Sequence, residues 1–278
     1  MRLAAIAFPA IDPIAFRVGP FAVRWYGIAY LLGFLGAYLV LRLLVRRWRL
    51  NLSEDDLLNI ILAAVVGVVV GGRLGYVVFY GDGYYWQNPA QIPALWDGGM
   101  SFHGGLAGIL IAGAFVAYSI RMPWLTLCDV GAVGAPIGIF FGRLANFVNQ
   151  ELWGRVTTVP WGVVFPAAGT SPRHPSQLYE ALLEGLVIFL VMIVLGARRD
   201  PLPQGVLLGV MISLYGVFRM SVELLREPDV QIGYLPGGIT MGQALSAPLV
   251  LCGVGLVAWS LWRDLPQMGR PRQESDAA

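Results

Sequence analysis

One segment of the chain places several polar side chains at the end of an apolar stretch. Residues 142–154 read GRLANFVNQELWG, which contains Arg143, Asn146, Glu151 and Gly154. An arginine inside a bilayer costs free energy, so it is retained there for an anionic ligand or for a buried partner. The segment therefore predicts either anion binding at a membrane boundary or a structural ion pair.

A second row of polar residues has helical spacing. Tyr215, Arg219 and Glu223 recur at i, i+4 and i+8, and Arg226 follows, so they share one helical face. Two further segments repeat the pattern: Gln177, Glu180 and Glu184 form one such row, and Arg143 and Asn146 form another. These rows predict a common polar centre. A buried ion pair between Arg219 and Glu223 is the alternative.

His103 and Arg73 are the next candidates. His103 stands beside two glycines at an expected helix start, and Arg73 lies within the glycine ridge Gly67, Gly71 and Gly75, which favours close helix packing. Histidine often serves as a general base near neutral pH, although one at a membrane interface can be purely structural. No carboxylate and histidine set has metal-ligand spacing, so we expect neither a metal nor another cofactor.

The composition is that of a polytopic membrane protein. Hydrophobic residues make up 57% and charged residues 13% of 278 residues, whereas soluble domains carry about 25% charged residues. The net charge of +2 gives no indication of nucleic-acid binding. The chain contains no lysine, which excludes a retinal photoreceptor.

Apolar runs of about 20 residues predict seven transmembrane helices in an all-α domain over 1–263. The spans are about 21–44, 57–79, 102–120, 124–146, 177–196, 205–225 and 241–262. We expect an interfacial segment before the first span, a small periplasmic cap or a packed connector at 147–175, and a disordered cytoplasmic tail at 264–278.

The arginines predict the orientation of these spans. With seven spans, one face collects most of the arginines in loops and ends, and the positive-inside rule makes that face cytoplasmic: Arg42, Arg46, Arg47, Arg49, Arg121, Arg198, Arg199, Arg263, Arg270 and Arg272. The N-terminus is then outside and the C-terminus cytoplasmic. The polar rows, Tyr26 and His103 fall in the outer half of the spans, while Asp129 is the exception in the inner half. A transporter would need polar groups through the whole thickness, so one outward-facing pocket fits better.

A ligand for this pocket must be anionic, amphiphilic and reachable from the outer leaflet. A phospholipid meets all these conditions, because its phosphate lies at the headgroup level and suits the planar guanidinium group. Residues alone thus indicate a lipid-handling protein, with several phospholipid-using transferases as alternatives.

The motifs resemble those of bacterial prolipoprotein diacylglyceryl transferases over about residues 12–262. The resemblance rests on residues 23–27 (VRWYG), 71–76 (GGRLGY), 102–106 (FHGGL), 142–154, 174–180 (HPSQLYE) and 215–229. Ala145 stands where the family often has glycine. The resemblance implies an enzyme of the bacterial inner membrane with its active site in the periplasmic leaflet.

The implied reaction moves the diacylglyceryl group of phosphatidylglycerol to the lipobox cysteine of a prolipoprotein signal peptide, forming a thioether and releasing glycerol 1-phosphate. The partners would be this phospholipid, the prolipoprotein and the surrounding membrane lipids, without nucleic acid. We expect His103 to accept the thiol proton and Arg143 and Arg219 to hold the phosphate. Tyr26 would join this catalytic group by lining the same pocket. Binding of phosphatidylglycerol would also involve Arg73, Asn146, Glu151, Gly154 and Glu223. Asn146 and Glu151 would fix the headgroup or the Arg143 rotamer, and Glu223 would orient Arg219.

Overall fold

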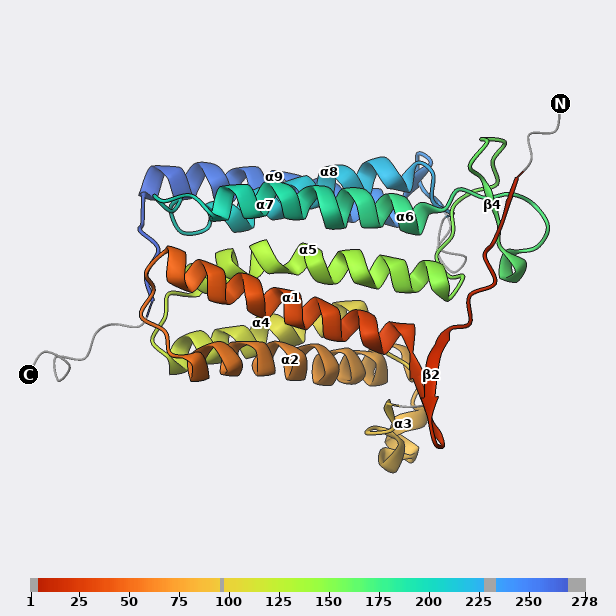
Figure 1. Ribbon diagram of the computed structural model, residues 1–278, viewed down its shortest axis with the longest axis horizontal. Helices are drawn as coiled ribbons and strands as arrows, with labels where there is room; N and C mark the ends of the chain where they lie inside the picture. The colour runs from red at the N-terminus through yellow and green to blue at the C-terminus, as the bar shows by residue number, and fades with distance from the viewer. Residues whose placement is uncertain (1–4, 96–97, 228–233, 270–278) are drawn as a thin grey trace, which may run out of the picture. The chain divides into compact units, whose positions relative to one another are not determined.

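The chain folds into long apolar helices joined by short loops and small strand pairs. The computed structural model describes residues 5–95, 98–227 and 234–269. The predicted apolar segments all become helical, in chain order α1 (Trp25–Arg47), α2 (Glu54–Tyr80), α4 (Phe102–Ser119), α5 (Trp124–Val148), α6 (Ser176–Glu180) continuing through η4 (Ala181–Val187) into α7 (Ile188–Gly196), α8 (Val206–Glu223) and α9 (Met241–Arg263) (Figure 1). The prediction of a polytopic all-α membrane protein is confirmed.

Six of these helical segments, among the residues described, are long and apolar enough to cross a membrane. The apolar helix His103–Ser119 is shorter than the others. The seventh crossing and the orientation therefore stay predictions. The predicted spans differ from the helices by a few residues at their ends, because caps rather than hydropathy fix where a helix begins. Ser53, for example, caps α2 through a capping box with Asp56.

The chain divides into two compact units, which are described separately. Unit 1 contains Met1–Val40 and Asp129–Pro266, and unit 2 contains Leu41–Cys128 and Gln267–Ala278. The single domain expected over 1–263 stays a prediction. The end of the expected tail, residues 270–278, lies outside the described part of the chain.

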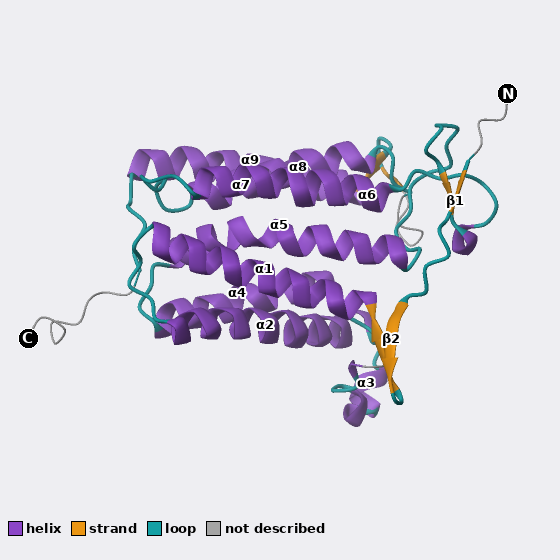
Figure 2. Ribbon diagram, viewed as in Figure 1, coloured by secondary structure: helices purple, strands orange, loops and turns teal. Residues whose placement is uncertain are grey.

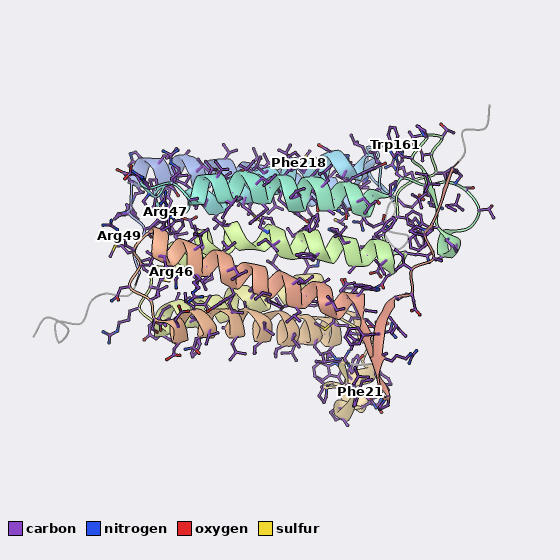
Figure 3. The ribbon with its side chains drawn as sticks, in the orientation of Figure 1. Phe21, Arg46, Arg47, Arg49, Trp161 and Phe218 are labelled. Carbon is purple, nitrogen blue, oxygen red and sulfur yellow. The ribbon has the colours of Figure 1, made fainter. Side chains whose placement is uncertain are left out.

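In unit 2, α2 and α4 lie side by side because glycines from both helices meet (Figure 1). A Cβ atom at Gly67 would lie 2.6 Å from the carbonyl oxygen of Gly108, and one at Gly75 would lie 2.7 Å from the Cα of Gly104. The ridge predicted from sequence thus allows the two backbones to touch. At the end of α1, Figure 3 shows Arg46, Arg47 and Arg49 together.

In unit 1, the helices also meet through small residues. Gly185 of η4 approaches α5 so closely that a Cβ atom there would lie 2.7 Å from the Cα of Phe140. Asp129 accepts hydrogen bonds from the amides of Gly205 (2.7 Å) and Leu208 (2.8 Å) at the start of α8. This carboxylate of α5 thus caps a neighbouring helix.

The strands of unit 1 are short and lie outside the long helices (Figure 2). β2 (Ile14–Val18) and β3 (Phe21–Arg24) form an antiparallel hairpin with Phe21 at its tip (Figure 3). β1 (Ile6–Ala7) pairs in parallel with β4 (Val163–Val164), and β5 (Tyr234–Leu235) pairs with β6 (Ile239–Thr240).

The segment expected as a cap or connector, residues 147–175, packs around one aromatic side chain. Phe165 is fully buried, and its ring lies 5.6 Å from Phe8, 5.7 Å from Phe147 and 6.3 Å from Trp153. The segment also contains the 3-10 turn η3 (Pro166–Ala168). A small core of its own holds this segment and the N-terminal strand together, and its periplasmic location stays a prediction.

Candidate active site

Arginines and glutamates from α5, α6, η4 and the end of α8 form a buried cluster in unit 1. We call it the Arg–Glu cluster, and its members are Arg143, Glu180, Glu184, Arg219, Glu223 and Arg226. The i, i+4 rows of the sequence bring these groups together, since each row occupies the inner face of its helix.

Glu180 is the centre of the cluster. Its Oε2 lies 2.9 Å from Nε of Arg143, and its Oε1 lies 2.7 Å from Nη1 of Arg219 and 3.0 Å from Nη1 of Arg226. The Glu180 side chain is fully buried. A buried carboxylate needs such partners, because an unpaired buried charge is costly.

Glu184 has a different environment, although it lies one turn away on the same face. Its oxygens are 3.6 Å from Nη2 of Arg143 and 3.9 Å from Nη1 of Arg219, and neither oxygen receives a hydrogen bond. Glu184 belongs to η4, a π-helical segment. Such wider turns are frequent at functional sites.

The arginines of the cluster keep an accessible side that the glutamates lack. The side chains of Arg143 and Arg219 are 19% and 14% exposed, whereas those of Glu180 and Glu184 are 0% exposed. The expected ion pair of Arg219 with Glu223 is present, at 2.9 Å. The ion-pair interpretation of these arginines is therefore realised, and the arginine side chains keep a partial exposure that the carboxylates lack.

Tyr26, Asn146 and Glu151 form a hydrogen-bonded row in the same unit. Nδ2 of Asn146 lies 2.7 Å from Oε1 of Glu151 and 3.4 Å from Oη of Tyr26. Asn146 is buried, and it lies three residues after Arg143 on α5. These three residues, predicted separately from the sequence, are thus joined by hydrogen bonds, and their contact with a headgroup stays a prediction.

The backbone after α5 is held in an unusual conformation. Gln150 and Leu152 have positive φ angles of 54° and 58°. The carbonyl groups of Glu151 and Leu152 accept hydrogen bonds from Gln177 (2.6 Å) and Ser176 (2.9 Å) at the start of α6. Strain of this kind persists where surrounding contacts impose it, which is common at functional sites.

Gly154 is required by close backbone packing. A Cβ atom at this position would lie 2.6 Å from both the Cβ of His174 and the carbonyl oxygen of Leu225. Its amide donates to the carbonyl of His174 at 2.8 Å. These contacts explain why glycine stands at this position, and a part for Gly154 in binding the phospholipid stays a prediction.

In unit 2, Arg73 has partners that sequence reasoning did not anticipate. Its Nε, Nη1 and Nη2 donate to the carbonyl groups of Ile92 (2.6 Å), Gly98 (2.6 Å) and Gln91 (2.7 Å), and the residue is 4% exposed. Its donors thus bind main-chain carbonyl groups of η1 (Pro89–Gln91) and of the loop after it, and a role of Arg73 in binding the phospholipid stays a prediction.

His103 lies in the first turn of α4, as the sequence predicted, and it is exposed. Ser101 caps this helix by accepting a hydrogen bond from the amide of Gly104 at 3.2 Å.

The other histidine, His174, lies in the turn before α6, with its Nδ1 at 3.2 Å from Oη of Tyr179. Burial lowers the pKa of His174 below its ordinary value of 6.5. Within the described residues, no cluster of His, Cys, Asp and Glu side chains could hold a metal ion.

Comparison with known proteins gives one consistent result. The family model described as prolipoprotein diacylglyceryl transferase matches residues 13–259. The chain is 50% identical over 247 residues to the phosphatidylglycerol–prolipoprotein diacylglyceryl transferase of Geobacter sulfurreducens, covering 89% of this chain and 94% of that protein. The protein of the same name from Brucella ovis is 52% identical over 268 residues, covering 93% and 94%. The chain belongs to the prolipoprotein diacylglyceryl transferase family.

Two glutamates of the cluster were not among the site residues predicted from the sequence. Glu180 and Glu184 were recognised as one helical face, and their spacing was the signal that could have placed them opposite Arg143 and Arg219. Sequence spacing within one helix does not say which neighbouring helix it faces, so the pairing needed the structure.

Proposed function

We propose that this chain transfers the diacylglyceryl group of phosphatidylglycerol to the lipobox cysteine of prolipoproteins, the first step of lipoprotein maturation. Membership of the family over residues 13–259 carries the proposal. The Arg–Glu cluster supports it, because partly exposed guanidinium groups over buried carboxylates suit a lipid phosphate.

The reaction forms a bond between the cysteine sulfur and a glycerol carbon and breaks the bond between that carbon and the phosphate oxygen. The electron pair stays with the departing glycerol 1-phosphate, and the thiol proton goes to a base. A free thiol with a pKa of about 8.5 is mostly protonated near pH 7, so a base or a strongly positive site is needed. His103 is proposed as that base, supported by its exposed place at the start of α4.

Arg143 and Arg219 are proposed to hold the phosphate and to stabilise the charge that builds on the leaving group. Hydrogen bonds between charged groups contribute about 1.5–3 kcal/mol each. The Nη2 group of Arg143, 3.6 Å from Glu184, is free of a short contact to that carboxylate. A phosphate oxygen can therefore approach this nitrogen without displacing the 2.9 Å contact between Nε and Glu180.

Positioning is assigned to the groups around these arginines. Glu223 orients Arg219 through their 2.9 Å ion pair, and Glu180 holds both arginines from behind. Tyr26 lines the pocket, and Asn146 and Glu151, joined at 2.7 Å, fix the glycerol headgroup through their remaining polar atoms. Gly154 contributes by permitting close packing against His174 and Leu225.

The proposed topology has seven crossings, including α4, with the N-terminus outside and the C-terminus in the cytoplasm. Loop arginines support this orientation by the positive-inside rule. The active site then faces the periplasmic leaflet of the inner membrane, and residues 147–175 form a cap on that side. Both substrates reach the site laterally, because the prolipoprotein is already anchored by its signal helix.

Incubation of the purified chain with phosphatidylglycerol and a lipobox peptide tests the function. Mass spectrometry should find the peptide heavier by one diacylglyceryl group, and replacing the peptide's cysteine by serine should abolish the increment. His103→Gln, Arg143→Ala and Arg219→Ala should each abolish transfer while the protein stays in the membrane. If the wild-type chain left the mass of the peptide unchanged, the result would contradict the proposal and favour another phospholipid-using transferase.

A further inference from the structure

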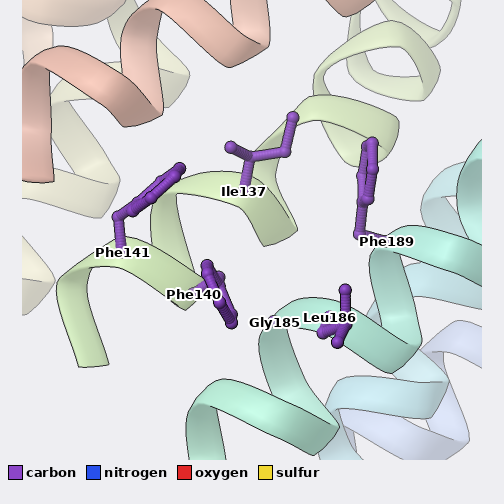
Figure 4. A pocket seen from close by; sticks show the side chains of 6 residues that line it. All are labelled: Ile137, Phe140, Phe141, Gly185, Leu186 and Phe189. Atoms are coloured by element: carbon purple, nitrogen blue, oxygen red, sulfur yellow. The ribbon is translucent and has the colours of Figure 1, made fainter. Parts of the chain in front are cut away.

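An apolar groove lies next to the Arg–Glu cluster in unit 1. It has a volume of about 190 Å³ and is lined by Ile137, Phe140, Phe141, Gly185, Leu186 and Phe189. All of these residues come from α5 and from the helix that runs through η4 into α7, and Figure 4 shows the side chains of the five other than Gly185 around this space. We call this space the α5–α7 groove.

The groove begins within one helical turn of the charged cluster on both of its walls. Phe140 precedes Arg143 by three residues on α5, and Gly185 directly follows Glu184 on η4. At a rise of about 1.5 Å per residue, Phe140 lies about 4.5 Å and Ile137 about 9 Å from Arg143 along the helix axis. A molecule with a phosphate at Arg143 would therefore place its apolar part in the groove.

Gly185 sets the depth of the groove. It is buried against the backbone of α5, where an added Cβ atom would lie 2.7 Å from the Cα and Cβ of Phe140. Leu186, the next residue, is 38% exposed and forms one side of the opening. The floor is thus a close helix contact, and the walls are large side chains.

The occupant must be narrow, apolar and attached to an anion. A helix is about 10–12 Å across with its side chains, and a space of about 190 Å³ is too small to enclose one. A single extended hydrocarbon chain is much narrower than a helix. We propose that the α5–α7 groove binds one acyl chain of the phospholipid whose phosphate contacts Arg143 and Arg219, and that Leu186 and Phe189 set its preferred length; this rests on the proposed function.

The test is a competition between two lipids. The full chain in detergent micelles receives equal amounts of dilauroyl and dipalmitoyl phosphatidylglycerol with a lipobox peptide, and mass spectrometry gives the ratio of the two products. Leu186→Trp, which fills the groove, should shift the ratio toward the shorter chain by about 10-fold, the scale by which an apolar pocket separates ligands that differ by a methylene group. Phe189→Ala should shift the ratio toward the longer chain.

Leu182→Trp is the matched control, because Leu182 is a 51% exposed leucine of η4 that does not line the groove. It should keep the wild-type ratio. If Leu186→Trp is inactive with both lipids, Phe189→Ala decides alone. An unchanged ratio in the active groove variants overturns the proposal, and so does a changed KM for the peptide with an unchanged lipid ratio, which would assign the groove to the signal segment.

A readout without turnover separates this inference from the proposed function. Native mass spectrometry of the wild-type chain should show that it retains the dipalmitoyl over the dilauroyl lipid, and Leu186→Trp should remove this preference. If the wild-type chain fails to modify the peptide but shows this retention, the proposed reaction is wrong and the groove assignment stands. Equal retention by the wild-type chain and Leu186→Trp overturns the groove assignment.

Discussion

Arg219 of α8 forms an ion pair with Glu180 of α6, with Nη1 of the arginine 2.7 Å from Oε1 of the glutamate. The same carboxylate contacts Arg143 and Arg226, so one buried side chain of α6 fixes guanidinium groups from α5 and from the end of α8. The positions of the proposed phosphate ligands therefore depend on a residue that is itself inaccessible.

Glu180→Gln should destabilise the protein and impair transfer together. The substitution leaves Arg143 and Arg219 without their shared counter-charge, and breaking a buried pair typically costs about 3–5 kcal/mol. The melting temperature in detergent and the rate of peptide modification measure the two effects. Glu54→Gln is the control, because Glu54 and Arg42 pair at 3.0 Å with side chains 53% and 42% exposed, where a pair contributes at most about 1 kcal/mol. Equal melting temperatures for the two variants would contradict the central role of Glu180.

Arg143→Lys should abolish most of the activity although it keeps the positive charge. Arg143 uses Nε toward Glu180 and presents Nη2 on its other side, a geometry that a single ammonium group does not reproduce. Loss of one donor to a developing anion typically lowers turnover about 100-fold or more. Arg42→Lys, in an exposed pair, provides the comparison. Turnover of Arg143→Lys within a few-fold of wild type would show that charge alone suffices.

Arg73→Lys should act on stability rather than on lipid binding. The guanidinium group holds the loop through donors to Gln91, Ile92 and Gly98, and one ammonium group replaces only part of this set. We expect faster proteolysis of residues 91–99 and a lower melting temperature. The KM for phosphatidylglycerol of the folded fraction should stay near the wild-type value. A selective rise in that KM would restore Arg73 as a lipid ligand.

The contrast between Arg73 and Arg143 shows how far the sequence alone could go. Hydropathy predicted every long apolar helix, since the bilayer imposes their length, and helical spacing predicted which polar residues share a face. Hydropathy gives no information on whether an arginine will meet carboxylates or main-chain carbonyls. Arg73 lies near a loop whose carbonyl groups turn inward, and only the folded loop shows this.

The partners within the site were less predictable than its members. Asn146 and Glu151 are five residues apart, and their 2.7 Å contact occurs where Gln150, between them, has a positive φ angle, which is uncommon for residues other than glycine. Asp129 likewise caps α8, whose first residues lie more than 70 positions further along the chain. Such contacts depend on tertiary packing, which local patterns do not encode.

Stability should fall as the pH is lowered through the titration range of His174. Burial lowers the pKa of this histidine in the folded state from its ordinary value of 6.5, so the unfolded chain binds more protons in this range. The contribution of His174 is then fully present above about pH 6.5 and is lost as the pH falls toward the lowered pKa. His174→Gln should flatten this part of the curve of melting temperature against pH. An identical curve for the variant would contradict the assignment.

Two glycine substitutions should have opposite effects on the helices. Gly67→Ala places a Cβ atom 2.6 Å from the carbonyl oxygen of Gly108, so α2 and α4 must separate, and the melting temperature should fall by several degrees. Gly131→Ala, on α5, meets no atom within 4 Å, and alanine favours a helix over glycine by up to about 1 kcal/mol. This variant should therefore be as stable as wild type or slightly more stable. If Gly67→Ala matched Gly131→Ala in thermal unfolding, close contact between the two backbones would not be what joins α2 to α4.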